Sequence, residues 1–229
     1  MVVAVAALAV GPAQPELHVG PKPPAFWPPP VLSHERAMAE TVRVDSRGGG
    51  VFDTGTGVSI GAHVVLTNAH LTTDAVTLVT RCDDQLLAVD RIARADDGTD
   101  AAVVVTTGPN LAPVEPADHD PTVGDRIAMV GYPKGELRLT EGFVEGGDGT
   151  VIRFSPEPQV GQSGSPLLDA DGRLVGLAFA DDTVGHQGFA IPVSKLRPIL
   201  DAFRTSGVPI ADPTAGDEGA AAARSSFCT

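Results

Sequence analysis

The central part of this chain is a series of short, β-branched apolar runs separated by Gly, Asp or Pro. Runs of this length, interrupted by turn residues, are typical of a β-sandwich or a β-barrel. The 26 glycines and 20 prolines among 229 residues likewise favour many turns over long helices. The runs are Thr41–Val44, His63–Thr67, Ala75–Thr80, Ala101–Thr106, Arg126–Val130, Thr150–Phe154, Arg173–Phe179 and Phe189–Val193.

Helical periodicity is found only near the C-terminus. Apolar residues follow the i, i+3, i+4, i+7 spacing there, after Ser194 as a candidate N-cap and before Gly207, which can end a helix. We therefore expect an all-β fold with one short C-terminal helix over about 195–206. The apolar positions of this helix are Leu196, Ile199, Leu200 and Phe203.

The two ends of the chain differ in composition from its body. Residues 1–10 are apolar and resemble the core of a secretory signal, although no basic region precedes them, and they lead us to expect a secreted or extracytoplasmic protein. The Pro-rich residues 11–30 predict an extended leader, and the Ala- and Gly-rich residues 211–229 predict a disordered tail. The foldable part is then 31–210, in which the Pro-rich stretch 112–122 suits a crossover between halves at about 31–112 and 123–193.

The net charge of −13 limits the possible partners. A strongly acidic chain is repelled by a phosphate backbone and by anionic lipids, so we expect neither nucleic acid nor a charged membrane surface as a partner. No apolar run reaches the roughly 18–20 residues that a transmembrane helix needs, so we expect no stable membrane span. Two cysteines, Cys82 and Cys228, are too few for a structural zinc site. They could form one disulfide that ties the C-terminal tail to the body, or remain two unpaired thiols.

The segment from Gly161 to Pro166, Gly-Gln-Ser-Gly-Ser-Pro, is the most informative for chemistry. Glycines on both sides of Ser163 allow a tight turn that exposes the hydroxyl and brings backbone N–H groups together beside it. A serine hydroxyl is a weak nucleophile unless a base activates it and a third group orients that base. By itself, such a segment is more often an ordinary turn.

Candidate partners for Ser163 lie upstream at the ends of buried strands. The run from Val64 to Thr67 leads into His70, and Asp100 precedes the run Ala101–Val105. A lone histidine at a strand end is more often structural, and Asp96 and Asp97 are rival acids nearby. The three residue types in the order His, Asp, Ser are nevertheless difficult to produce by chance.

With these motifs the chain resembles the chymotrypsin-fold serine proteases, in the compact bacterial form of HtrA/DegP catalytic domains. Leu66–His70 is similar to the family's histidine motif, Asp100–Val103 to its aspartate motif, and Gly161–Pro166 to its Gly-Asn/Asp-Ser-Gly-Gly-Pro motif. The segments around Gly55–Val58 and Gly188–Pro192 also match, so the resemblance covers about residues 50–205. Nothing in the sequence resembles the PDZ domain that often follows such proteases. The resemblance implies two six-stranded antiparallel β-barrels with the active-site cleft between them.

The resemblance also implies roles for individual residues in a serine endopeptidase without cofactor or metal. Ser163 would be the nucleophile, His70 the general base and Asp100 the residue that orients the imidazole. The backbone N–H groups of Gly161 and Ser163 would form the oxyanion hole. Substrate binding would involve the small or apolar positions of two neighbouring strands, which favour small or medium apolar substrate side chains: Ala178, Phe179, Ala180, Phe189 and Ala190.

Two positions depart from the family pattern. Gln162 stands where trypsin-type enzymes have an Asp that pairs with a new N-terminal ammonium, so we expect the oxyanion site to be set by loop ordering instead. Ser165 replaces a glycine beside the nucleophile.

The sequence excludes one alternative to an active protease and leaves others open. An α/β-hydrolase is excluded because its elbow requires glycine at position 165 and a distant histidine after the serine. A protease-fold protein that binds peptides or a partner protein without cutting them stays open, as does a purely structural β-protein. Asp181, Asp182 and His186 could hold a metal, but a solvated turn explains them better.

Overall fold

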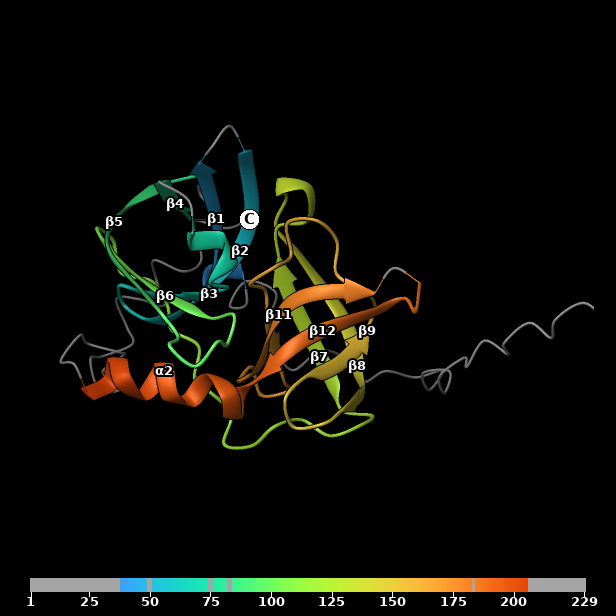
Figure 1. Cartoon of the computed structure of the whole chain (residues 1–229). Coiled ribbons are helices and arrows are strands. Elements are labelled where there is room, and N and C mark those ends of the chain that lie inside the picture. The colour runs from blue at the N-terminus through green and yellow to red at the C-terminus, as the bar shows by residue number, and fades with distance from the viewer. Residues whose placement is uncertain (1–37, 49–50, 74–75, 82–83, 183, 206–229) are drawn as a thin grey trace, which may run out of the picture.

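The computed structural model describes residues 38–48, 51–73, 76–81, 84–182 and 184–205. Its strands form two closed antiparallel barrels of six strands each (Figure 1). In the first barrel the strand order is β1-β2-β3-β6-β5-β4. Its strands are β1 (Thr41–Gly48), β2 (Val51–Gly61), β3 (Val64–Thr67), β4 (Val76–Thr80), β5 (Leu86–Arg94) and β6 (Ala102–Thr107).

The second barrel lies beside the first and has the order β10-β11-β12-β9-β8-β7. The two barrels and the helix that follows them confirm the fold expected from the sequence. The outer domain boundaries stay predictions, because residues 1–37 and 206–229 lie outside the described residues. The strands of this barrel are β7 (Arg126–Gly131), β8 (Arg138–Gly147), β9 (Ile152–Ser155), β10 (Pro166–Leu168), β11 (Leu174–Asp182) and β12 (Gln187–Pro192). Two short 3₁₀ helices are also present: η1 (His70–Thr72) follows β3, and η2 (Pro133–Gly135) follows β7.

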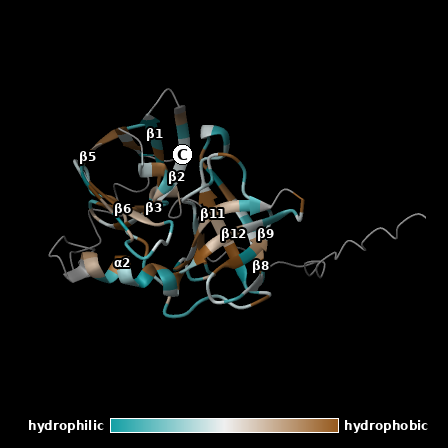
Figure 2. Cartoon of the chain, in the orientation of Figure 1, coloured by the Kyte–Doolittle hydropathy of each residue, from teal (hydrophilic) through white to brown (hydrophobic). Residues whose placement is uncertain are grey.

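Strands that face the other barrel are buried on both sides, which explains their continuous apolar runs. In β3, Val64 and Leu66 belong to a cluster that joins the two barrels, whereas Val65 points into the first barrel. In β10, Leu168 belongs to the joining cluster and Leu167 to the interior of the second barrel. Figure 2 shows hydrophobic residues on strands of both barrels and hydrophilic residues on many connecting loops. The largest apolar cluster is therefore the interface between the barrels.

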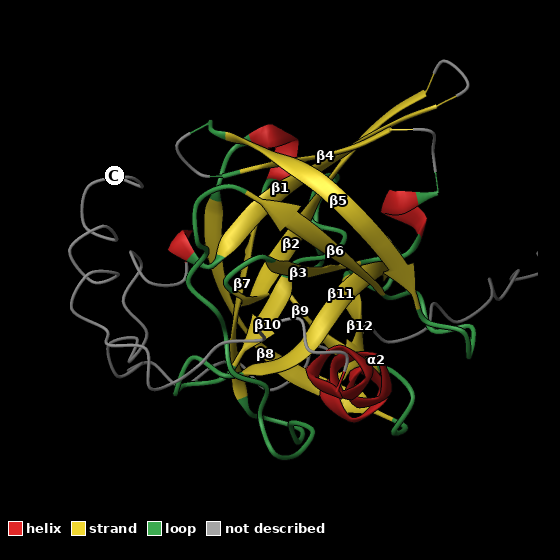
Figure 3. Cartoon of the chain, turned by 90° about the vertical axis from the view of Figure 1, so that its left-hand side faces the viewer, coloured by secondary structure: helices red, strands yellow, loops and turns green. Residues whose placement is uncertain are grey.

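The C-terminal helix α2 (Val193–Thr205) leaves β12 and runs along the first barrel (Figures 1 and 3). Its four predicted apolar positions are buried in the joining cluster. Ser194 lies inside the first turn and is not the N-cap. The carboxylate of Asp120, in the crossover, instead accepts hydrogen bonds from the Ser194 N–H at 2.9 Å and from its hydroxyl at 2.7 Å. The helix thus ties the second barrel to the first.

Replacing Leu66 by Ala is expected to lower the free energy of unfolding by about 2–5 kcal/mol. Leu66 is fully buried at the barrel interface, so the truncation loses apolar burial and leaves a cavity. Urea denaturation of the purified variant measures the change. Leu86, which is 59% exposed on β5, serves as the matched control, because its replacement by Ala is expected to change stability by less than about 0.5 kcal/mol. Equal stability of the two variants would contradict the proposed core.

Candidate active site

His70 and Asp100 are brought together by the pairing of β3 with β6. The two strands are antiparallel, with Thr67 opposite Ala102, so the segment that follows β3 and the segment that precedes β6 meet at one edge of the barrel. The Asp100 carboxylate accepts a hydrogen bond from the His70 backbone N–H at 2.9 Å and lies 2.7 Å from its Nδ1. The rival Asp97 is exposed and accepts instead from the N–H of Thr99. The structure thus places Asp100, of the candidate acids, against the histidine.

The environment of Asp100 favours its ionised form. Partial burial opposes the charge, but the hydrogen bonds from the His70 side chain and backbone outweigh it and hold the pKa of Asp100 below its ordinary value of 3.8. A lowered pKa in the folded state stabilises the fold at pH values above the ordinary one. That contribution is lost as the pH falls through the lowered pKa. Asp100 is therefore an anion at neutral pH, ready to orient the imidazole.

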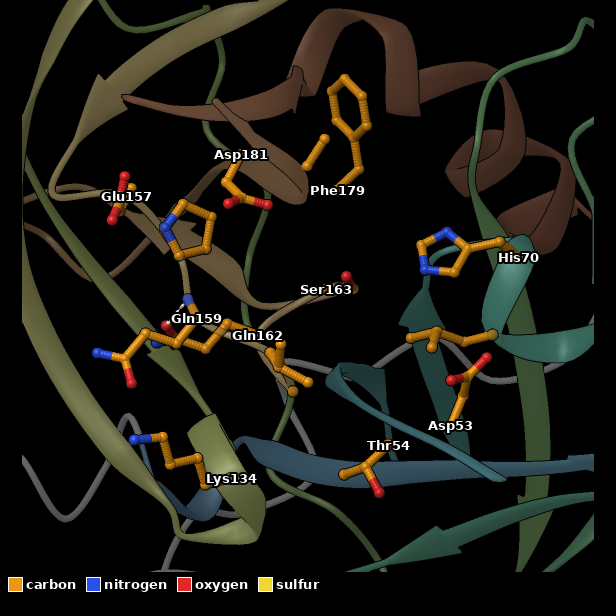
Figure 4. A pocket seen from close by; sticks show the side chains of 15 residues that line it. Asp53, Thr54, His70, Lys134, Glu157, Gln159, Gln162, Ser163, Phe179 and Asp181 are labelled. Carbon is orange, nitrogen blue, oxygen red and sulfur yellow. Dashed lines mark hydrogen bonds between the residues drawn. The ribbon is translucent and has the colours of Figure 1, made fainter. Parts of the chain in front are cut away.

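Ser163 lies across a pocket from His70, in the turn that precedes β10 (Figure 4). The pocket has a volume of about 690 Å³, and both residues are part of its wall. No hydrogen bond joins the two side chains, although both are among the described residues. In free enzymes such bonds are often long and tighten only with substrate. The imidazole and the hydroxyl face the same space, in which a peptide carbonyl could be held.

The backbone turns through Ser163 with a left-handed residue on each side. Gly161 has φ +98° and Gly164 has φ +82°, a region that side chains disfavour. A Cβ atom on Gly161 would lie 2.2 Å from the Tyr132 carbonyl oxygen, and one on Gly164 would lie 2.0 Å from that of Thr56. Both positions therefore require glycine, and the tight turn leaves Ser163 exposed toward the pocket.

Two backbone N–H groups beside Ser163 have no acceptor among the described residues. The peptide group before Gly161 is oriented by its carbonyl, which accepts from the Lys134 N–H at 3.0 Å. The peptide group before Ser163 is oriented in the same way, because the Gln162 carbonyl accepts from the Ser165 N–H at 3.0 Å. In a trans peptide the N–H points opposite to the C=O. The N–H groups of Gly161 and Ser163 are thus directed away from these internal bonds and remain available to an oxyanion.

If the sequence-based prediction of an oxyanion hole holds, replacing Gly161 by Ala is expected to lower kcat/KM for a peptide substrate about 10²-fold or more, since it would displace one of the two predicted N–H donors. The added Cβ clashes with the Tyr132 carbonyl and strains the backbone. Steady-state hydrolysis measures the effect. The matched control is Gly124→Ala, because Gly124 also has a left-handed φ, +91°, but no atom within 4 Å of the added Cβ. A Gly161→Ala variant as active as this control would contradict the proposed oxyanion site.

The five expected substrate-binding residues divide into two groups. Phe179 and Ala180 line the pocket. Ala178 and Ala190 are fully buried inside the second barrel, and Phe189 is half-buried on β12, so the pocket wall as described does not include them. A bulge between Ala178 and Ala180 interrupts the alternation of side chains along β11, so the neighbouring Phe179 and Ala180 both lie at the pocket wall.

The pocket wall also contains charged residues that were not singled out as substrate-binding residues from the sequence. Asp53, Glu157 and Asp181 bring carboxylates to it, and Lys134 brings an ammonium group (Figure 4). These residues come from four separate segments, and only the fold brings them together. The half-buried Glu157 thus adds a carboxylate to a pocket for which the sequence predicted only small or apolar binding residues.

The remaining sequence-based candidates are the two cysteines and the acidic residues near His186. Cys82 and Cys228 lie outside the described residues, so their pairing stays untested. The described ranges contain no group of three or more potential metal ligands, and His186 lies 3.2 Å from Glu157 through its Nδ1. Among the described helices, none has the length and apolar character required to cross a membrane.

With this geometry established, the chain can be assigned to a family. Residues 55–177, more than half of its 229 residues, match the family described as the trypsin-like peptidase domain, and the chain belongs to that family. It is 27% identical over 168 residues to the serine protease Do-like HtrA of Bacillus subtilis, which covers 64% of this chain and 37% of the relative. It is 28% identical over 157 residues to a probable periplasmic serine endoprotease, DegP-like, of Halomonas elongata, covering 62% and 33%. The chain spans about a third of the length of these relatives.

Solved structures agree on the fold. The serine endoprotease from Yersinia pestis has a TM-score of 0.66 and 23% identity, covering 75% of this chain and 65% of that one. The active form of the Rv3671c protease from M. tuberculosis also has a TM-score of 0.66, with 20% identity, 72% of this chain and 81% of that one covered. These structures are similar to the two-barrel arrangement described above.

Proposed function

We propose that this protein is a serine endopeptidase that hydrolyses peptide bonds through an acyl-enzyme on Ser163. The observation that carries the proposal is the hydrogen-bonded pair of His70 and Asp100 facing Ser163 across one pocket. Two unpaired backbone N–H groups beside the nucleophile support it. A peptide bound in the pocket would bring its carbonyl between base and nucleophile.

The chemistry follows from the position of each group. His70 Nε2 takes the proton of the Ser163 hydroxyl as the oxygen attacks the scissile carbonyl. The N–H groups of Gly161 and Ser163 stabilise the resulting oxyanion. His70 then gives the proton to the leaving amine, and water repeats the sequence on the acyl-enzyme. Asp100, bound to Nδ1, keeps the reactive nitrogen directed toward Ser163 and stabilises the imidazolium.

Digestion of a mixture of unstructured peptides, followed by mass spectrometry of the fragments, tests this function. Endopeptidase activity predicts internal cuts at defined positions and a transient mass on the protein equal to that of an acyl group. A protein that binds the peptides but leaves them intact would be a binding module of protease fold, and this result would overturn the proposal.

We place the protein outside the cytoplasm. The apolar residues 1–10 support this proposal, and one relative is named a probable periplasmic endoprotease. A fusion of residues 1–30 to a reporter that is active only after export tests the location.

Peptides that carry Lys or Arg near the scissile bond are expected to be cut faster than peptides that carry Glu. The pocket wall holds three carboxylates and one ammonium group, so a cationic side chain is favoured. Glu157→Gln and Asp181→Asn are each expected to reduce this preference by up to about fivefold at low salt, because Glu157 is only half-buried and Asp181 is exposed, and charges in contact with solvent contribute modestly. Rates on matched peptides, measured with and without salt, check the effect. An unchanged preference in the double variant would show that other residues set it.

A further inference from the structure

We propose that Thr56 is a positioning residue that holds the oxyanion loop from the opposite barrel. The oxyanion loop is defined here as residues 159–163. Thr56 lies on β2 of the first barrel and is completely buried. This inference deepens the proposed endopeptidase function and rests on it, because it explains what fixes the two N–H donors.

Two polar groups of Thr56, its hydroxyl and its backbone N–H, make three hydrogen bonds to the second barrel. Its hydroxyl donates to the Gly161 carbonyl at 2.8 Å and accepts from the Tyr132 N–H at 3.0 Å. Its backbone N–H donates to the Ser163 carbonyl at 2.7 Å. A carbonyl can only accept and an N–H can only donate, so these partners fix the orientation of the hydroxyl hydrogen. Thr56 thus binds both residues that supply the oxyanion donors.

Thr56 itself is held in place within the first barrel. The hydroxyl of Thr67 donates to the Thr56 carbonyl at 2.6 Å. Thr67 ends β3, the strand that leads to His70. A chain of hydrogen bonds therefore runs from the strand that carries the base to the loop that carries the nucleophile.

The oxyanion loop also has bonds of its own. The Gln162 N–H donates to the Gln159 carbonyl at 2.9 Å, and the Gln159 N–H donates to Gln162 Oε1 at 2.7 Å. The peptide group between Gly161 and Gln162 is therefore held on both sides, because its carbonyl accepts from the Thr56 hydroxyl and its N–H donates to Gln159. Loss of that hydroxyl would leave the buried Gly161 carbonyl without this donor, and the loop would gain freedom to turn.

The decisive comparison is Thr56→Val against Thr56→Ser. Valine keeps the shape but loses the hydroxyl, whereas serine keeps the hydroxyl. We expect Thr56→Val to lower kcat about 10- to 100-fold and to change KM by less than about threefold. This loss of kcat is smaller than that caused by removing an oxyanion donor outright, because the donors remain but are held less firmly. Thr56→Ser is expected to restore kcat to within about threefold of the wild type. A peptide aldehyde, which forms an oxyanion on Ser163, should lose affinity in parallel with kcat, while the product peptide should not.

The control for general destabilisation is Ser59→Ala. Ser59 lies on the same strand, is fully buried and donates to the Gly61 carbonyl at 2.9 Å, remote from the pocket lining. It should lower stability without lowering kcat. Equal kcat values for Thr56→Val and Ser59→Ala would overturn the inference. If Thr56→Val does not fold, Thr56→Ala takes its place in the same comparison.

A readout independent of catalysis separates this inference from the proposed function. Hydrogen exchange of residues 159–163 is expected to be faster in Thr56→Val than in wild type, Thr56→Ser or Ser59→Ala. This result supports the inference even if the wild type cuts no peptide, an outcome that would contradict only the proposed function. Unchanged exchange in the oxyanion loop would overturn the role of Thr56 whatever the activity.

Discussion

Replacing Ser163 or His70 by Ala is expected to lower kcat for peptide hydrolysis about 10⁶-fold. In the proposed mechanism Ser163 supplies the attacking oxygen and His70, at the same pocket, is the base, so either change would remove covalent catalysis. The double variant should be no slower than the worse single variant, because the two residues act as one unit. Steady-state rates on a chromogenic peptide, at equal folded concentration, measure the losses.

Ser165→Ala provides the matched control for the nucleophile. Ser165 lies two positions after Ser163 and is fully buried, and its hydroxyl has no hydrogen-bond partner in the described part of the chain. Removing it is expected to leave kcat within about threefold and stability unchanged or improved. If Ser163→Ala retained the same activity as this control, Ser163 would not be the nucleophile.

Asp100→Asn is expected to lower kcat about 10⁴-fold with little change in KM. The Asp100 carboxylate accepts from both the backbone N–H and the ring Nδ1 of His70. An amide has one accepting oxygen, so its NH₂ group would face Nδ1 or the backbone donor. The imidazole would then carry its proton on the nitrogen that must accept one from Ser163. Rates measured from pH 6 to 10 should show the loss at neutral pH and partial recovery as hydroxide rises.

The control for this change is Asp97→Asn. Asp97 belongs to the same loop and is exposed, and its carboxylate accepts from Thr99 rather than from His70. Its replacement is expected to leave kcat within about twofold. Comparable losses in the two variants would show that loop folding, and not orientation of the imidazole, underlies the effect.

The strands that could be predicted from the sequence are those that contain a short run of β-branched and other apolar residues. The run Ala101–Thr106 is apolar up to Val105, ends in the buried Thr106 and corresponds to β6. β5 was not predicted, because it exposes Asp90 and Arg91 near a bulge that breaks its alternation. β8 was not predicted either, because it carries charged residues and glycines on a half-exposed strand. Strands that are buried on one face only and interrupted by a bulge show too weak an alternation of apolar and polar residues to be recognised in the sequence.

The residues of the candidate site also differ in whether the sequence alone could predict them. Local motifs pointed to His70, Asp100 and Ser163, and the structure puts the first two in hydrogen-bond contact and the third across the pocket. The charged pocket wall and the bonds of Thr56 depend on segments far apart in the chain. Only the packing of the two barrels brings such groups together, so the sequence held no local sign of them.

The most direct measurement is covalent labelling with a fluorophosphonate probe, which reacts only with an activated serine. The probe should label the purified wild type at Ser163, as located by peptide mass spectrometry, and should label neither Ser163→Ala nor His70→Ala. Labelling of the wild type at that one residue would show that base, nucleophile and oxyanion site work together. A folded wild type that stays unlabelled, with and without added peptide, would contradict the proposal that this protein is a serine peptidase.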